Sequence, residues 1–289
     1  MDFTKDFLKA KRPCADGFRW FLRHCGDAGG YQEVLDALVR AGRVDDACWL
    51  LAQFGPTDGV LELDAAEVDA LVFAGRIEVR GNLEADTVVR SGAGIRVGGS
   101  IRCGRALVAG GELRAGGAIR SDGTLEAAGG MRAAWSIETH GRLRSGGDVR
   151  AGRSLCCGDA FEVAGGALAG NDLIAAGAMR AKSLQAGDDI AAGEDVSATH
   201  GIVAGGTIRC GGHLRAGWGI KAGGSMLAAG SIRAGEGLHA ADTIRSGAGY
   251  GVFAGLDVHA DAWEASARVS AASRPEGLLS GWWTGPQRS

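Results

Sequence analysis

The sequence predicts a mainly β protein, a parallel β-solenoid with about three hexads in each triangular coil. Three observations support this fold class. A bulky apolar residue recurs every six residues over most of the chain, and a small residue follows it two places later. Gly accounts for 51 of the 289 residues and Pro for only 4. A small helical domain is expected before the repeats and an irregular cap after them.

The apolar markers run in steps of six from Ile77 to Met179, lose one residue, and resume from Leu184 to Leu256, with Tyr250 among them. Successive residues of a strand point to opposite sides. The marker and the small residue therefore share the inner side, and the charged residue between them faces outward. A helix is disfavoured, because a period of six does not fit 3.6 residues per turn.

The glycines between the markers predict sharp corners, since Gly reaches φ > 0 without a steric penalty. Three strands and three corners close a coil of about 18 residues, and parallel ladders stack such coils about 4.8 Å apart. Equivalent residues then form columns along the stack. The sequence leaves open the handedness of the coil, and whether the short hexad near Lys182 kinks the stack.

Three domains are expected. Residues 1–58 form a helical domain, whose last helix ends at Gly55 and Pro56. Residues 59–258 hold the repeats, and residues 259–289 cover the last coil. The apolar anchors expected in this tail are Trp263, Leu278, Leu279, Trp282 and Trp283.

The hexads resemble those of bactofilin-like, polymer-forming β-solenoids, whose strands also carry an inward Ile or Val between glycine-rich corners. This resemblance implies a self-assembling scaffold. The helical domain resembles the N-terminal segment of bacterial putative immunity proteins, in Ala15–Gly17 after Cys14, in Trp20 and in Trp49–Leu51. That resemblance implies a protein partner such as a toxin.

An enzyme is not expected, and neither are catalytic residues, metal ligands or cofactors. The six histidines fall at different hexad positions, whereas a catalytic zinc needs three converging ligands. The corners are too short to hold a substrate. Cys103, Cys157 and Cys210 occupy the small inward slot and are expected to serve packing. Cys156 faces outward, without an assignable basic partner that would make it reactive.

One outward column predicts a partner-binding site. Arg96, Arg114, Arg132 and Arg150 are each 18 residues apart, and Glu78 lies one coil before them. Stacked like charges repel, which indicates either neighbouring carboxylates or an anionic partner such as an acidic protein surface. The carboxylates expected nearby are Asp122, Glu126 and Glu138. A solvated face that keeps the protein soluble is the alternative interpretation.

Trp135 and Trp218 stand at corner positions where a small residue is usual. A large aromatic side chain there either folds over neighbouring coils or is displayed to a partner, because aromatic anchors are enriched at binding hot spots. Both tryptophans join the four arginines in the candidate partner-binding set.

Composition limits the partner and the compartment. The formal net charge of −3 lacks the basic footprint of a nucleic-acid-binding protein, so no nucleic acid is expected. There is no apolar run long enough for a membrane span and no signal-like start, which predicts a cytoplasmic protein. The seven scattered cysteines are expected to be reduced thiols.

Two functions remain. The preferred hypothesis is a non-enzymatic protein-binding module of the immunity or antitoxin kind, which occludes a toxin or another protein. The alternative is a self-assembling bactofilin-like scaffold. Polymerisation requires open terminal coils, and this chain has expected caps at both ends. A monomer or small homo-oligomer is therefore favoured over a filament.

Overall fold

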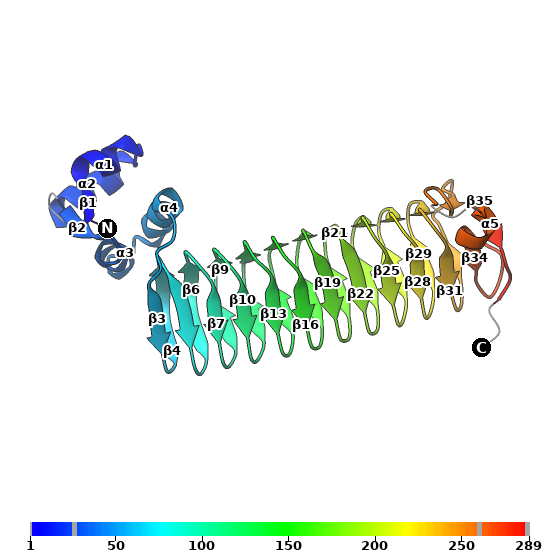
Figure 1. The fold of residues 1–289 in the computed structure, drawn as a ribbon, viewed down its shortest axis with the longest axis horizontal. Helices are drawn as coiled ribbons and strands as arrows, with labels where there is room; N and C mark the ends of the chain where they lie inside the picture. The colour runs from blue at the N-terminus through cyan, green and yellow to red at the C-terminus, as the bar shows by residue number, and fades with distance from the viewer. Residues whose placement is uncertain (1, 25–27, 259–261, 287–289) are drawn as a thin grey trace.

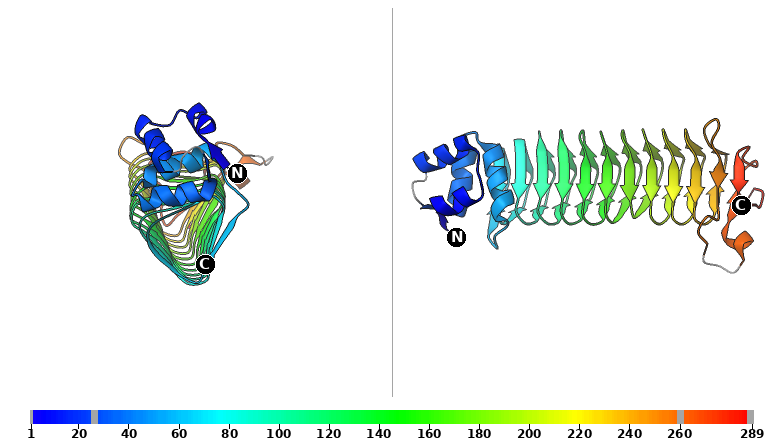
Figure 2. Two further views of the ribbon diagram at one scale, coloured as in Figure 1. Left: turned by 90° about the vertical axis from the view of Figure 1, so that its left-hand side faces the viewer. Right: turned by 90° about the horizontal axis from the view of Figure 1, so that it is seen from above.

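The structure is a computed structural model that describes residues 2–24, 28–258 and 262–286. It confirms the predicted fold class: about twelve turns of a parallel β-solenoid follow a small helical region (Figure 1). Viewed along its axis the solenoid has a triangular outline (Figure 2). We call its three sides face 1, face 2 and face 3, in the order in which the chain visits them.

Face 1 is a parallel sheet of thirteen strands. Its strands are β3 (Val60–Leu63), β5 (Arg76–Val79), β7 (Ile95–Val97), β10 (Leu113–Ala115), β13 (Met131–Ala133), β16 (Val149–Ala151), β19 (Gly166–Ala169), β22 (Ser183–Ala186), β25 (Ile202–Ala204), β28 (Ile220–Ala222), β31 (Leu238–Ala240), β34 (Arg268–Ser270) and β36 (Trp282–Trp283).

Faces 2 and 3 belong to one sheet, because two long strands, β4 (Ala66–Phe73) and β6 (Leu83–Ser91), run across both. Face 2 continues with β8 (Ile101–Cys103), β11 (Ile119–Ser121), β14 (Ile137–Thr139), β17 (Leu155–Cys157), β20 (Leu173–Ala175), β23 (Ile190–Ala192), β26 (Ile208–Cys210), β29 (Met226–Ala228) and β32 (Ile244–Arg245). Face 3 continues with β9 (Ala106–Ala109), β12 (Thr124–Ala127), β15 (Leu143–Ser145), β18 (Phe161–Val163), β21 (Met179–Ala181), β24 (Val196–Ala198), β27 (Leu214–Ala216), β30 (Ile232–Ala234), β33 (Val252–Phe253) and β35 (Leu278–Ser280).

The register of the ladders matches the expected coil. Leu113 pairs with Met131, 18 residues later. At the short hexad the offset falls to 17, so that Ala167 pairs with Leu184. Only Lys182 separates β21 from β22, and the ladders continue on all three faces past this corner. The missing residue is therefore absorbed in a corner, and the strands keep their pairing.

The interior of the solenoid is filled by one continuous cluster of apolar side chains from all three faces. In most strands the marker and the residue two places later are buried and the residue between them is not, as expected from the hexad. Phe161 is the largest fully buried side chain of this core. Where the small slot holds a hydroxyl, a corner carbonyl accepts its hydrogen bond, as from Ser145 Oγ to Gly129 O at 2.9 Å.

The glycines do not act in the way the sequence suggested. In the described stretch 28–258, positive φ occurs at Gly42, Gly55, Gly249 and Gly255, none of which is a corner of the regular coils. Corner glycines are needed instead because successive coils approach closely. A Cβ placed on Gly98 would lie 2.1 Å from the carbonyl oxygen of Arg80 in the preceding coil. Their role is steric, and the expectation of φ > 0 was wrong.

The helical region, called the head, covers one part of the first coil. It contains α1 (Lys5–Ala10), α2 (Ala15–His24), α3 (Tyr31–Arg40) and α4 (Val44–Phe54), with an antiparallel pair β1 (Asp2–Thr4) and β2 (Ala28–Gly30). Leu50 and Leu51 of α4 share a buried cluster with Val72 and Ala74 at the end of β4. Figure 2 shows the head over the upper part of the triangular end, with the lower corner uncovered. Among the strands that the structure describes, β3 thus stays an edge strand, bonded only to β5.

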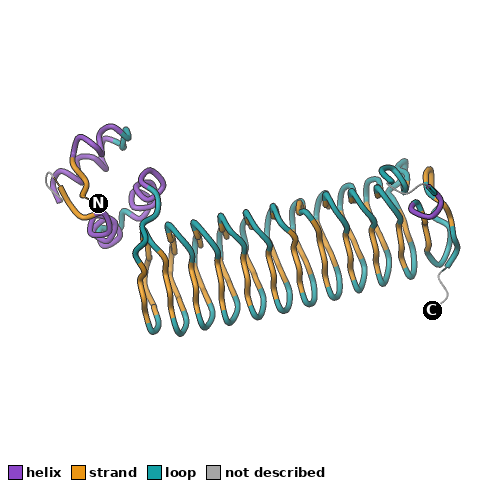
Figure 3. Tube along the Cα trace, viewed as in Figure 1, coloured by secondary structure: helices purple, strands orange, loops and turns teal. Residues whose placement is uncertain are grey.

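The far end differs from the expected irregular tail. Tyr250 and Leu256 are exposed and are not inward markers, because Val252 takes the buried position instead. After the short helix α5 (Trp263–Ser266), the chain adds β34, β35 and β36 to the parallel ladders (Figure 3). Leu278 and Trp283 pack against the core, as expected of anchors. Leu279 and Trp282 are 71% and 51% exposed, so these two are not anchors.

Candidate interaction surface

The arginine column lies on face 1 in perfect register. Arg96 pairs across the ladder with Arg114, Arg114 with Arg132, and Arg132 with Arg150. Glu78 precedes them in the column, and Leu168 follows. All four arginines are exposed. We call the surface formed by Arg96, Arg114, Arg132 and Arg150 the arginine face.

Two of the four arginines have carboxylate partners from their own coil. Arg114 Nη2 lies 2.5 Å from Glu112 Oε2, and Arg150 Nη2 lies 3.6 Å from Asp148 Oδ2. The corner column that supplies these acids alternates with glycine, so Gly94 and Gly130 stand at the same place before Arg96 and Arg132. Neither Arg96 nor Arg132 takes part in an ion pair within the described ranges.

The carboxylates expected from the sequence lie elsewhere. Glu138 is on face 2, where Glu138 Oε2 lies 2.5 Å from Arg120 Nη2. Glu126 projects from β12 on face 3, and Asp122 stands at the corner between faces 2 and 3. The true partners follow a local rule that the sequence does contain. Glu112 directly precedes β10 and lies two residues before Arg114, and residues two apart along an extended chain point to the same side.

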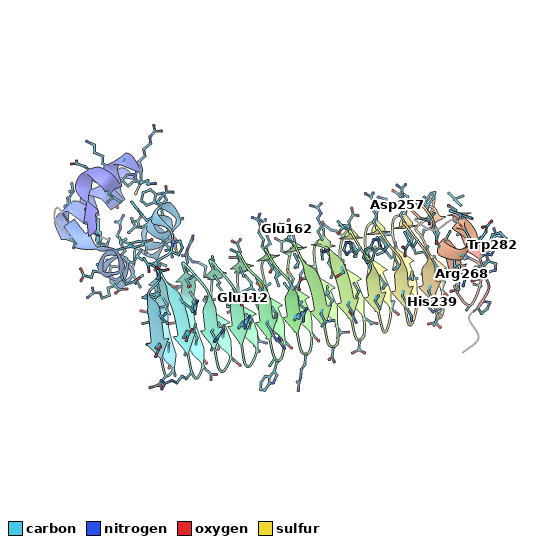
Figure 4. All side chains as sticks on the ribbon, in the orientation of Figure 1. Glu112, Glu162, His239, Asp257, Arg268 and Trp282 are labelled. Atoms are coloured by element: carbon cyan, nitrogen blue, oxygen red, sulfur yellow. The ribbon has the colours of Figure 1, made fainter. Side chains whose placement is uncertain are left out.

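A shallow hollow runs along the arginine face. It has a volume of about 330 Å³ and lies between the side chains of Glu112, Arg114, Arg132, Asp148 and Arg150. Its floor includes Gly130 and Gly147, which have no side chains to fill the space. Glu112 marks this face in Figure 4, on the side toward the viewer. The hollow offers guanidinium donors along its length.

Trp135 borders the arginine face. It follows β13 at the corner between faces 1 and 2 and is 56% exposed. The guanidinium of Arg153, one coil later, lies 5.9 Å from the centroid of the Trp135 ring. The aromatic ring therefore stays at the surface, beside the strand that carries Arg132.

Trp218 lies apart from the other five candidate residues. It stands at the opposite corner, between faces 3 and 1, and several coils further along the stack. Its ring stacks on His200 of the preceding coil, with centroids 3.9 Å apart and planes 5° apart. Trp218 is still 48% exposed. The structure thus brings together the four arginines and Trp135, and it separates Trp218 from them.

The four cysteines of the solenoid strands occupy unreactive positions. Burial raises the pKa of the Cys103 and Cys157 thiols, and raises that of Cys210 to about 11. Cys156 faces outward from β17, and its pKa is also raised, first by burial and then by the carboxylates of Glu138 and Asp172. Within the described residues no three His, Cys, Asp or Glu side chains gather in a way that could hold a metal ion.

Comparison with known proteins gives a family match for the head alone. Residues 1–54 match the family model of the YdhT N-terminal domain. No match was found among curated proteins or solved structures. The YdhT-like head ends where α4 ends, at Phe54, before the first strand of face 1. No bactofilin or immunity family model matches, so both of those resemblances stay predictions.

The YdhT-like head contains a partly open, mostly apolar pocket of about 190 Å³, lined by residues of α1, α2, α3 and α4. Trp20, Phe21, Leu38 and Trp49 are among its lining residues. The carboxylate of Asp46 also lines it and is neutralised by Arg43, whose Nη2 lies 2.5 Å from Asp46 Oδ2. Among the described helices of the chain, none has the length and apolar character needed to cross a bilayer.

Proposed function

We propose that this protein is a non-enzymatic binding module whose arginine face recognises an acidic strip on a protein partner. The observation that carries the proposal is the row of four in-register arginines, of which Arg96 and Arg132 have no carboxylate within ion-pair distance in the described residues. A β-solenoid suits a protein-interaction or scaffold role, because it presents an extended rigid surface.

The spacing of the arginines defines the partner's geometry. Neighbouring strands lie about 4.8 Å apart, so four arginines span about 15 Å. Carboxylates one helical turn apart are about 5 to 6 Å from each other, which is close to this spacing. Each guanidinium can bind a carboxylate through two parallel hydrogen bonds. An acidic helix laid along the column would therefore meet one arginine after another.

Occlusion of a toxin is the specific form of binding that we propose for this surface. The stack is rigid, because every coil is hydrogen-bonded to the next, and its regular corners are short. A rigid surface loses little conformational entropy on binding. Cytoplasmic action is part of the same proposal and rests on the scattered cysteines of the sequence.

A self-assembling scaffold is the second candidate, and one observation favours it. The head covers only part of the first coil, and β3 remains an edge strand. However, this edge bears Glu62 and Asp64, and β4 next to it bears Glu67. Charged side chains on an edge strand oppose strand addition. The geometry therefore supports the discrete binding module better than the filament.

The proposal can be tested with an oligo-glutamate peptide as a generic acidic probe, followed by products of neighbouring genes. We expect Arg96→Glu/Arg132→Glu to weaken binding by at least about tenfold. The matched control is Arg102→Glu/Arg142→Glu, which makes the same charge change at exposed positions outside face 1. Equal binding by both double variants would refute the arginine face, and tighter binding of duplex DNA than of the peptide would refute a protein partner.

A further inference from the structure

Face 3 carries a second ordered column, in which opposite charges alternate. The ladder pairs Glu126 with Arg144, Arg144 with Glu162, and Glu162 with Arg180. Uncharged residues bound the column, Val108 before it and Ser197 after it. Figure 4 shows Glu162 on the upper side of the stack, away from the side that bears Glu112. The column thus reads acid, base, acid, base over four consecutive coils.

These four side chains do not neutralise one another within the chain. On face 2, Arg120 and Glu138 are also ladder neighbours, and they form a 2.5 Å ion pair. On face 3, by contrast, none of the ion pairs or side-chain hydrogen bonds of the described residues involves Glu126, Arg144, Glu162 or Arg180. Charges at ladder spacing that remain unpaired are available to an external partner.

A broad groove lies along the same coils. Its volume is about 950 Å³, and its lining includes all four charged residues and Val108. Small corner residues such as Gly110, Gly146 and Ala164 leave this space open. The groove therefore has no strong net charge, since two acids and three bases face it, with Lys182 at its edge as the third base. A partner that is uniformly acidic or uniformly basic would meet repulsion at every second coil.

We propose that a second copy of this chain occupies the groove, with the two solenoids antiparallel and face 3 against face 3. A twofold axis that runs along the strands, between Arg144 and Glu162, reverses the order of the column. Glu126 then lies opposite Arg180 of the other copy, and Arg144 lies opposite its Glu162. All four positions meet an opposite charge, each pair occurring twice. A parallel arrangement would oppose each residue to its own copy, with four like-charge contacts.

The size of the contact predicts a weak dimer. Six coils of about 4.8 Å, from Val108 to Ser197, and a face about 15 Å across would bury roughly 900 Å² in total. That area is at the low end for specific interfaces, so we expect dissociation constants on the order of 100 μM. Because the contact is electrostatic, the dimer should weaken as salt rises. The arginine face remains outside the contact in both copies.

Sedimentation velocity on the full chain, from about 5 to about 500 μM and in about 50 and about 500 mM NaCl, tests the proposal. Wild type should shift from monomer to dimer with concentration at low salt, and less so at high salt. Glu162→Arg should abolish the shift, because Arg144 then meets an arginine twice. The matched control Glu84→Arg, with the same charge change at an exposed position on face 2, should dimerise like wild type.

The double exchange Arg144→Glu/Glu162→Arg tests whether residues 144 and 162 pair between the two copies. Its column reads acid, acid, base, base, which is again fully complementary when antiparallel, so the dimer should return. Circular dichroism melting checks that each variant is folded. A wild type that stays monomeric throughout would overturn the proposal. So would a dimer that survives Glu162→Arg, or a double exchange that fails to restore dimerisation. None of these outcomes depends on the arginine face.

Discussion

The side-chain amide of Gln32 makes two hydrogen bonds with the backbone next to Ala74, as a neighbouring strand would do. Ala74 N donates to Gln32 Oε1 at 2.9 Å, and Gln32 Nε2 donates to Val72 O at 3.1 Å. Val72 and Ala74 are buried. The Gln32 side chain of α3 thus bonds the free backbone groups at the end of β4, where the described residues form no preceding coil.

Gln32→Ala should loosen the head from the solenoid. It leaves one buried amide and one buried carbonyl without a partner, which costs about 1 to 3 kcal/mol for each unsatisfied group. We expect a lower thermal midpoint and faster proteolysis between Phe54 and Val60. Gln53→Ala, at an exposed position of α4, is the control. Unchanged proteolysis of Gln32→Ala would show that the other contacts of α4, the burial of Leu50 and Leu51 and the Asp45–Arg105 ion pair, are enough to hold the head.

Replacing a corner glycine should destabilise the stack in proportion to the closeness of the neighbouring coil. The Cβ of Gly98→Ala would lie 2.1 Å from Arg80 O, so the coils must separate locally. Overpacking of this kind costs about 1 to 3 kcal/mol. In Gly201→Ala the Cβ would lie 3.4 Å from Gly219 O, an ordinary contact. Thermal denaturation should separate the two variants, and equal midpoints would contradict the steric role.

The two exposed tryptophans should differ in binding. Trp135→Ala removes the ring over which the Arg153 guanidinium lies, at the corner next to Arg132. Because that cation loses its fixed position, we expect affinity for the acidic probe to fall roughly fivefold. Trp218→Ala removes a ring that stacks on His200 at another corner, and affinity should not change. Fluorescence anisotropy with the labelled peptide measures both. An equal loss in the two variants would mean that the binding surface extends over both corners.

His239 should make the stability depend on pH. Its pKa is lowered, first by burial and then by Lys221, and its Nδ1 lies 2.6 Å from Ser270 Oγ. Between the lowered folded pKa and the unfolded value near 6.5, the unfolded chain binds more protons. The free energy of unfolding is therefore highest above about pH 6.5, and it declines as the pH falls toward the pKa of His239 in the folded protein.

Thermal midpoints from pH 7.5 to pH 5.5 test this dependence, with about 6.5 as the expected onset. His239→Gln should flatten the pH profile. His140→Gln, which changes an exposed histidine elsewhere on the stack, is the matched control. If wild type and His239→Gln lose stability in parallel over this range, the titration of His239 does not contribute.

The hexad predicted most of the fold because inward and outward positions are set within three residues. Ile119, Arg120 and Ser121 adopt the expected buried, exposed, buried pattern without any long-range information. The ladder register of Arg96 and Arg114 followed from coil length alone. Periodicity therefore sufficed to predict the order of the outward columns, although not what each column binds.

The missed features depend on packing between coils or on the ends of the stack. The steric role of Gly98 needs the position of Arg80 O in the preceding coil. Tyr250 keeps the six-residue phase and is nevertheless exposed, because Val252 replaces it where the last coils accommodate the tail. The pairing of Glu112 with Arg114 depends on the corner just before β10, whose acidic residue alternates with glycine from coil to coil, and the hexad does not specify that residue.

The corner at Lys182 shows where the chain can change its length. One residue fewer leaves the pairing of Ala167 with Leu184 and of Leu173 with Ile190 in phase. Strand length is fixed by the ladders, whereas corner length is not. Corners are therefore the sites of this protein that should best tolerate insertions. An epitope or a fluorophore-binding loop inserted at a corner would be displayed at a chosen position along the solenoid axis.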